Sequence, residues 1–253
     1  MISSSSALGG GTKHMFMLGE RLENKFKIYY AIPKNSVFKK FLHKSNHIEI
    51  SERSITIKDI KNLKKFVKFN SIDIIHAHGK GAGLIGRLIK IYTNIPLIYT
   101  FHGIHLKCHN FLNRLIYIIY EFIFGWVDSQ KILVSKSEEE YAKSSHIFLG
   151  KRYKIINNGV PNMPKKANKE FGNMFDESSK KSIFKVITIC RFVNQKNIKD
   201  IINIALRLPN INFSIIGDGP LWEEINQIIL KRKVKNVFLE GRKKNVFKYL
   251  YES

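Results

Sequence analysis

The sequence predicts an α/β protein built from parallel sheets and their connecting helices, in two successive domains. Short apolar runs typical of buried strands alternate with longer runs of helical period along most of the chain. The alternation stops over 161–182, a segment rich in Pro, Asn, Lys and Ser, and resumes at 183. At 253 residues the chain is long enough for two domains. We therefore expect a first domain over 1–160, a linker over 161–182 and a second domain over 183–253.

In the first domain, strands are expected where short runs of β-branched and aromatic residues occur, at 27–32, 47–50, 72–75, 95–101, 131–134 and 154–156. Helices are expected between them, at 15–22, 36–43, 58–69, 83–91, 111–127 and 137–143. Thr12 is a candidate cap for the first helix. The segment 111–127 is the most apolar of the chain, but it carries polar residues and is too short to span a bilayer, so it is interpreted as a mostly buried helix.

In the second domain the strands are expected at 184–190, 211–216 and 236–239, and the helices at 197–208, 221–232 and 243–250. This is about half the content of a doubly wound domain of ordinary size. In the first domain only a few residues precede the glycines at 9–11, where a buried first strand is expected. The sequence therefore predicts a clipped first strand and an incomplete second domain.

Composition limits the possible partners and the compartment. The net charge of +23 favours anionic partners, such as a phosphate-rich ligand or an anionic membrane face, although part of it reflects a Lys- and Asn-rich composition. No helix-turn-helix, RNA-recognition or zinc-finger pattern is present, so nucleic acid is not expected as a partner. Cys108 and Cys190 are far apart, which favours a reducing compartment such as the cytoplasm.

Two groups of residues fall where ligands bind in α/β sheets. Gly9, Gly10 and Gly11 precede a predicted helix, where backbone N–H groups can approach a phosphate or sugar. Histidines at 76, 78 and 102 end two predicted strands, and those at 105 and 109 follow closely. These side chains could line a polar pocket or bind zinc, but no zinc-binding spacing is present, and we predict no metal.

In the second domain, Arg191 and Lys196 lie between a predicted strand and a predicted helix. Arg presents a rigid fork to phosphate oxygens and Lys a mobile point charge, so the pair is a candidate clamp for a diphosphate. Such a turn lies at the carboxyl end of a strand, where ligands bind in open α/β sheets. Two solvated charges in a basic chain are the alternative interpretation.

Seven motifs occur together in the order in which they occur in one enzyme family. They are Gly9-Gly10-Gly11, His76-Ala-His-Gly-Lys-Gly-Ala-Gly83 with Gly86-Arg87, Tyr99-Thr-Phe-His-Gly103, Val134-Ser135, Ile156-Asn-Asn-Gly-Val160, Arg191 with Lys196, and Ile215-Ile-Gly-Asp-Gly-Pro220. Through them nearly the whole chain resembles the family 4 (group 1) glycosyltransferases. The resemblance implies the GT-B fold, with one near-complete Rossmann-like domain on the acceptor side and, here, an incomplete second one that binds the donor nucleotide.

The resemblance also implies roles for individual residues. The loop Gly9–Gly11 approaches the donor phosphate and sugar, and His102 contacts the donor sugar. Arg191 and Lys196 hold the diphosphate. Gly217 and Gly219 let a loop pass close to the nucleotide, and Arg242 lies near the nucleobase pocket.

The implied function is transfer of a sugar from a nucleotide-diphosphate sugar to a glycan or lipid-linked acceptor in surface polysaccharide synthesis. Family members usually retain anomeric configuration and need no metal or cofactor; no Asp-x-Asp occurs here, which is consistent with that. Contact with the inner face of the membrane is a further expectation. The family's Glu-x7-Glu stretch and final crossing helix do not occur, so the chain is expected to be truncated and its activity is in question. A non-catalytic sugar- or partner-binding protein and a GT-B sugar-nucleotide 2-epimerase remain alternatives.

Overall fold

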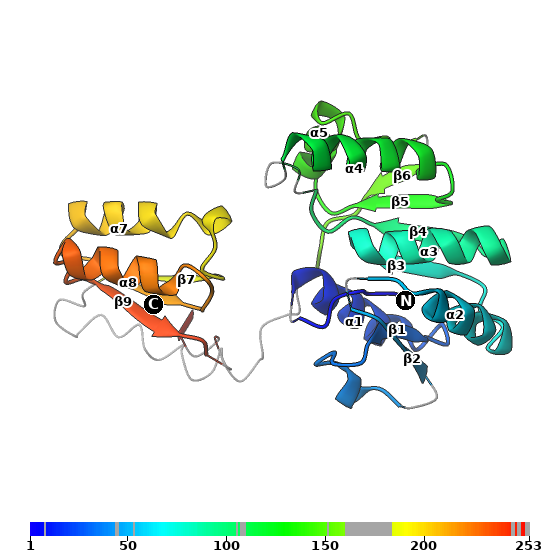
Figure 1. Ribbon diagram of the computed structural model, residues 1–253. Helices are drawn as coiled ribbons and strands as arrows, with labels where there is room; N and C mark the ends of the chain where they lie inside the picture. Colours follow the sequence, from blue (N-terminus) through cyan, green and yellow to red (C-terminus); the bar gives the residue numbers. More distant parts are fainter. Residues whose placement is uncertain are drawn as a thin grey trace. The chain divides into compact units, whose positions relative to one another are not determined.

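The computed structural model describes the chain except residues 8, 44–45, 53, 105, 107–109, 151, 160–183, 244–245, 247–248 and 251–253. The chain divides into two compact units, Met1–Val160 and Pro161–Ser253. Each unit is α/β with parallel strand pairing, as predicted (Figure 1). The expected linker, half of the expected helix 243–250, and His105 and His109 lie outside the described residues.

The first unit is a parallel sheet built from β1 (Tyr30–Pro33), β2 (His47–Ile50), β3 (Ile75–His78), β4 (Leu97–Thr100), β5 (Gln130–Leu133) and β6 (Tyr153–Ile155). β1 pairs with β2, and β3 to β6 pair in chain order. Ile2 joins the two sets, because it forms bridges to Ala31 of β1 and Ala77 of β3. The expected clipped first strand is thus short, but it occupies the position between β1 and β3 and holds the sheet together.

Helices pack against this sheet: α1 (Gly10–Leu22), α2 (Ile57–Phe69), α3 (Lys80–Thr93), α4 (Phe111–Phe124) and α5 (Lys136–Ser144). A capping box fixes the start of α2, since Thr56 and Asp59 bond each other's backbone N–H groups. The helix expected at 36–43 is only a single 3₁₀ turn, η1 (Lys39–Phe41). The prediction that Thr12 caps this helix was wrong, because α1 already begins at Gly10 and buries Thr12 inside its first turn.

The interpretation of 111–127 as a mostly buried helix was wrong. α4 lies on the outside of the first unit (Figure 1), and within it only Tyr117 and Glu121 are buried. Its hydrophobicity made it resemble a core helix, but no described element covers its outer side. Within the described part of the chain, no helix combines the length and hydrophobicity needed to cross a membrane.

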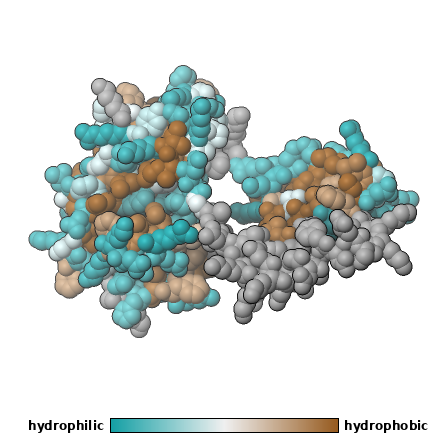
Figure 2. Space-filling model, turned by 180° about the vertical axis from the view of Figure 1, so that it is seen from behind, coloured by the Kyte–Doolittle hydropathy of each residue, from teal (hydrophilic) through white to brown (hydrophobic). Residues whose placement is uncertain are grey.

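The second unit is a sheet of order β7 (Lys185–Ile189), β8 (Asn212–Ile216) and β9 (Val237–Gly241), with α7 (Ile198–Arg207) and α8 (Trp222–Lys231). A 3₁₀ turn, η4 (Asn194–Lys196), leads into α7. Phe192, Ile202 and Ile225 are fully buried between the helices and the sheet. Seen from behind, apolar surface gathers in patches on both units (Figure 2).

Candidate functional site

Four histidines meet at the carboxyl edge of the first sheet. His76 and His78 end β3, and His102 follows the end of β4. The register pairs His78 with Thr100, which brings His102, two residues after the end of β4, close to His78. His14 reaches the same place from α1, with its ring centroid 4.9 Å from that of His102 and 5.8 Å from that of His78.

The histidine rings form a connected cluster. His78 Nδ1 and His102 Nε2 are 2.9 Å apart, so one of the two donates a hydrogen bond to the other. His76 Nε2 lies 2.9 Å from Thr100 Oγ1. Buried His14 Nδ1 and His78 Nε2 have no hydrogen-bond partner among the described residues. Unpartnered buried nitrogens are costly, so a bound ligand that reaches them would gain hydrogen bonds.

The backbone at His102 is held in an unfavourable conformation. Its φ is +59°, in the left-handed region that non-glycine residues seldom adopt. Glu138 holds the loop there: its carboxylate accepts from Gly103 N at 2.5 Å and from Val134 N at 2.7 Å. Such strain persists only where the surroundings enforce it and is concentrated at functional sites.

The three glycines at the start of α1, Gly9, Gly10 and Gly11, have different surroundings. A Cβ at Gly11 would lie 3.1 Å from His102 Cγ, so a larger residue there would crowd the histidine ring. A Cβ at Gly9 or Gly10 would meet no protein atom within 4 Å. Packing within the protein therefore gives no reason for glycine at these two positions, and the space beside them is open to a ligand.

The clustered histidines are neutral at physiological pH. Burial lowers the pKa of His76 to about 3 and that of His102 to about 4, and it also lowers the pKa of His14 and, strongly, that of His78. A neutral imidazole both donates and accepts, as a sugar hydroxyl does, so the cluster suits uncharged polar groups. His14, His78 and His102 offer nitrogens within 4.8 Å of one another, a spacing that a metal ion could also use. Since His78 and His102 already bond each other, the absence of a metal remains our prediction.

These pKa values predict the direction of the acid sensitivity. The unfolded chain binds protons to His76 and His102 near pH 6.5, whereas the folded chain does so only near pH 3 to 4. Stability is therefore complete above pH 6.5 and is lost as the pH falls toward 4. Between pH 7 and 5 each histidine is expected to contribute a loss of up to about 2 kcal/mol. Urea unfolding at several pH values should give a shallower slope for His76→Gln than for the wild type, and equal slopes would contradict the assignment.

In the second unit, Arg191 and Lys196 follow the carboxyl end of β7 as predicted. Fully buried Phe192 anchors the loop: its N–H donates to Asp218 O at 3.0 Å, and its ring packs on Trp222. Both basic side chains are exposed and have no hydrogen-bond or ion-pair partner among the described residues. The loop is fixed while its two cations remain free for a ligand.

Gly217 and Gly219 lie on the adjacent loop, after β8. Both have positive φ, and a Cβ would lie 1.8 Å from Cys190 O at Gly217 and 2.6 Å from Phe192 O at Gly219. Glycine is needed at both positions because the backbone around Arg191 packs against them. The sequence alone did not show this contact. Arg242 is exposed directly after β9, beside the same edge, since Gly217 N donates to Gly241 O at 3.0 Å. All five predicted residues of this unit thus share one edge of its sheet.

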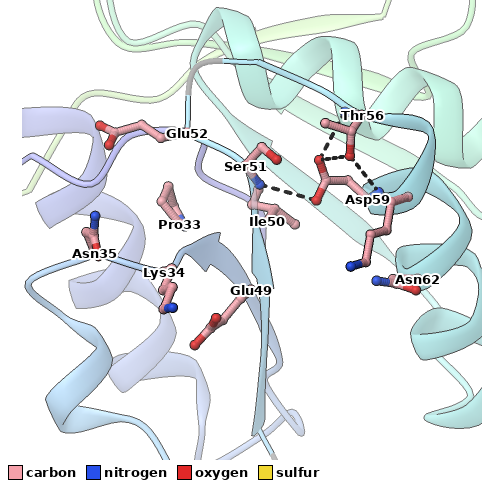
Figure 3. Close-up of a pocket in the computed structure, with 11 residues that line it drawn as sticks. Pro33, Lys34, Asn35, Glu49, Ile50, Ser51, Glu52, Thr56, Asp59 and Asn62 are labelled. Atoms are coloured by element: carbon pink, nitrogen blue, oxygen red, sulfur yellow. Dashed lines mark hydrogen bonds between the residues drawn. The ribbon is translucent and has the colours of Figure 1, made fainter.

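An open pocket of about 580 Å³ lies at the same edge of the first sheet as the histidines. It is formed by the ends of β1 and β2 and the start of α2 (Figure 3). Asp59 is occupied by bonds to Ser51 and Thr56. The pocket is also lined by Lys34, Asn35 and Asn62, whose side chains have no hydrogen-bond partner among the described residues.

Sequence reasoning missed two residues of the histidine site. His14 was overlooked because it lies on a helix, although its position three residues after Gly11 places both on one helical face. Glu138 was not among the predicted site residues, because no sequence signal connects it with Gly103, 35 residues earlier.

Comparison with known proteins gave consistent matches. Residues 8–162 match the model of Glycosyltransferase Family 4. An uncharacterized glycosyltransferase of Methanocaldococcus jannaschii is 30% identical over 243 residues, 93% of this chain and 64% of that protein. The O-antigen biosynthesis glycosyltransferase WbnH of Escherichia coli is 24% identical over 187 residues, 74% of this chain and 52% of WbnH.

Two solved structures share the fold. Anabaena HepE in complex with UDP-glucose superposes with a TM-score of 0.73 at 16% identity, covering 98% of this chain and 70% of HepE. Sucrose-phosphate synthase of Thermosynechococcus elongatus gives a TM-score of 0.68 at 16% identity, covering 99% of this chain and 71% of the synthase. The chain thus spans about two thirds or less of the curated relatives and about 70% of these structures.

Proposed function

The chain belongs to glycosyltransferase family 4 and has the GT-B fold, and from this we propose that it transfers a sugar from a nucleotide-diphosphate sugar to a glycan or lipid-linked acceptor. Synthesis of surface polysaccharide is the proposed context, supported by the O-antigen function in the name of WbnH. The observation that carries the proposal is the strained His102 packed on Gly11 at the open edge of the first sheet.

We propose separate roles toward the donor for the residues of each unit. Neutral His14, His78 and His102 offer hydrogen bonds to sugar hydroxyls, and the space at Gly9 and Gly10 admits the sugar or a phosphate. Arg191 and Lys196 hold the diphosphate, and Arg242 lies toward the nucleobase. UDP is the first nucleotide to test, because HepE is described in complex with UDP and UDP-glucose.

The proposed mechanism is retaining and independent of metal. Departure of a nucleoside diphosphate concentrates negative charge on its phosphate oxygens, and fixed cations stabilise that charge in the transition state. Arg191 can donate two parallel hydrogen bonds to the diphosphate, while Lys196 adds a second positive charge. These two cations perform the role that a divalent metal performs in other transferases.

The open pocket beside the histidine edge is the proposed acceptor site. The side chains of Lys34, Asn35 and Asn62 provide both donors and acceptors of hydrogen bonds, which suits a polyhydroxylated glycan (Figure 3). Its sheet edge is shared with His102, so acceptor and donor sugar would meet on one side of the sheet. The reaction is proposed to take place in the cytoplasm at the inner face of the membrane.

The direct test is turnover of UDP-glucose and other sugar nucleotides, measured as nucleotide release with and without acceptor glycans. His102→Asn is expected to lower the rate about 10-fold or more, because it removes a sugar contact while asparagine tolerates the left-handed backbone. His47→Gln, at the amino edge of the sheet, is the matched control and should keep the wild-type rate.

The other outcomes separate the alternatives. Binding of a sugar nucleotide without turnover of any donor would identify a non-catalytic binding protein. Epimerisation of a UDP-sugar in the absence of an acceptor would identify a 2-epimerase instead. Equal rates for His102→Asn and the wild type would remove His102 from the site.

A further inference from the structure

Three recesses follow one another along α2 and share residues. The open pocket at the carboxyl edge of the sheet shares Lys58 and Asn62 with a second recess of about 550 Å³. That recess shares Lys64 and Lys65 with a third, of about 410 Å³, which is also lined by Tyr92 of α3. The second and third recesses form what we term the α2 groove, whose charged residues are Lys58, Lys61, Lys64, Lys65 and Lys68. The α2 groove thus continues from the proposed acceptor pocket along the helix.

The charge of the α2 groove is uncompensated. All the charged side chains that line it are lysines, and none of their amines forms a hydrogen bond or an ion pair with a described residue. The amine of Lys64 lies 4.3 Å from the ring centroid of Tyr92. The only acidic residue of α2, Asp59, is buried and engaged in the capping box. Like charges three or four residues apart destabilise a helix, so a bound anion would relieve this repulsion.

Packing of α2 keeps the lysines at the surface. Leu63 and Val67 of the helix are buried in the core of the first unit. The lysines at 58, 61, 65 and 68 are spaced by three or four residues, so they share the opposite side, and all four are exposed. Over the ten residues from the first to the last, this row is about 15 Å long. It is long enough to contact several units of an extended chain.

The open pocket differs from the α2 groove in charge. Three acidic residues, Glu49, Glu52 and Asp59, line the pocket together with Lys34 and Lys58. Carboxylates in the pocket repel an anionic group, whereas the groove beside it attracts one. The path from pocket to groove therefore favours a chain that is neutral at one end and acidic behind that end.

We propose that the α2 groove binds carboxylate-bearing sugars of the acceptor glycan, while a neutral sugar at the end of that glycan occupies the open pocket. A recessed path that begins at the pocket fits an extended chain better than it fits a flat surface such as a bilayer. Tyr92 is 58% exposed and offers a flat apolar ring against which a sugar can pack. This inference rests on the proposed function, because it names the chemical class of the acceptor.

The test measures binding of oligogalacturonate, a chain of carboxylate-bearing sugars, by calorimetric titration without a sugar nucleotide. Its fully methyl-esterified form has the same length and linkage but no charge. We expect oligogalacturonate to bind about 10-fold or more tightly than the ester, and added salt to weaken its binding. Hyaluronan oligosaccharides, in which acidic and neutral sugars alternate, provide a second linkage and should show the same dependence on salt.

Matched variants test whether the position of the charge matters. The double variant Lys61→Gln, Lys65→Gln should weaken binding of oligogalacturonate about 10-fold, because it removes two ion pairs with the carboxylates. The control is Arg152→Gln, Lys154→Gln, which removes the same charge at the edge strand β6 and should keep the wild-type affinity. All four side chains are exposed, so folding should be retained, and circular dichroism can check it.

Several outcomes would overturn the proposal. They are the absence of binding to both acidic glycans, equal affinity for the methyl ester, and an equal loss of binding in the control variant. Tighter binding to phosphatidylglycerol vesicles or to a DNA oligonucleotide, lost in Lys61→Gln, Lys65→Gln, would assign the groove to another polyanion. Sugar transfer to neutral glycans alone would reject the acidic class but keep the transferase. Binding of acidic glycans without turnover of any donor would reject the transferase but keep the groove as a binding site.

Discussion

Replacing Arg191 or Lys196 with alanine is expected to lower sugar transfer about 100-fold or more, since each removes a cation from the charge that develops on the leaving diphosphate. Both side chains are exposed and unpaired among the described residues, so their removal breaks no contact that stabilises the fold. The loop itself is retained because Phe192 remains buried. The rate should therefore fall with little change in the melting temperature.

The control for this experiment is Lys235→Ala. Lys235 is exposed just before β9, at the amino edge of the same sheet. Its replacement therefore removes the same charge from the opposite edge of that sheet. The measurement is nucleotide release from the donor, together with calorimetric titration of the free nucleoside diphosphate. Wild-type binding and rate in Arg191→Ala would refute the proposed diphosphate clamp. An equal loss of binding and rate in Lys235→Ala would show that the effect comes from the net charge of the unit and not from the position of Arg191.

Replacing Arg87 with methionine is expected to destabilise the first unit by about 3 to 5 kcal/mol. Arg87 is fully buried; its Nε and Nη2 donate to Asp128 at 2.9 and 2.6 Å, and Nη2 also donates to Glu121. Methionine fills much of the same space but leaves two carboxylates buried beside a single remaining cation, Lys131, which is 3.7 Å from Asp128. The cost arises from those unpaired charges more than from lost packing.

Denaturant unfolding of three proteins tests this explanation. Arg114→Met changes the same residue type on the exposed side of α4 and should shift stability by less than about 0.5 kcal/mol. The triple variant Arg87→Met, Glu121→Gln, Asp128→Asn also removes the two unpaired carboxylates and should recover part of the lost stability. A stability near that of the wild type for Arg87→Met alone would contradict the ionic origin of the effect.

Much of the fold could be predicted because it depends on local patterns. Alternating apolar runs predicted the parallel α/β class, and the positions of His102 and Arg191 after strands placed each at the carboxyl edge of its sheet. Parallel strands connected by helices bring their carboxyl ends to one edge, so a residue after a strand can be assigned from sequence alone. Whether these residues bind the donor remains a prediction.

The errors came from features that depend on contacts distant in sequence. α4 has the hydrophobicity of a core helix, but its exposure depends on whether another segment covers it. Its single acid faces inward because Arg87, 34 residues earlier, lies beneath it. The first strand is short, as expected, but only the bridges of Ile2 to Ala31 and Ala77 show that this segment lies in the middle of the sheet.

The sequence by itself determined the fold class, the family resemblance and the sheet edges at which the candidate residues lie, because strand and helix periods and turn residues act over a few neighbouring positions. Only the tertiary structure decided that His14 joins His78 and His102, that Gly11 packs against the ring of His102, and that α4 presents its apolar side outward. Those features depend on which distant side chains share a space, and hydrophobic patterning specifies burial without naming the partner.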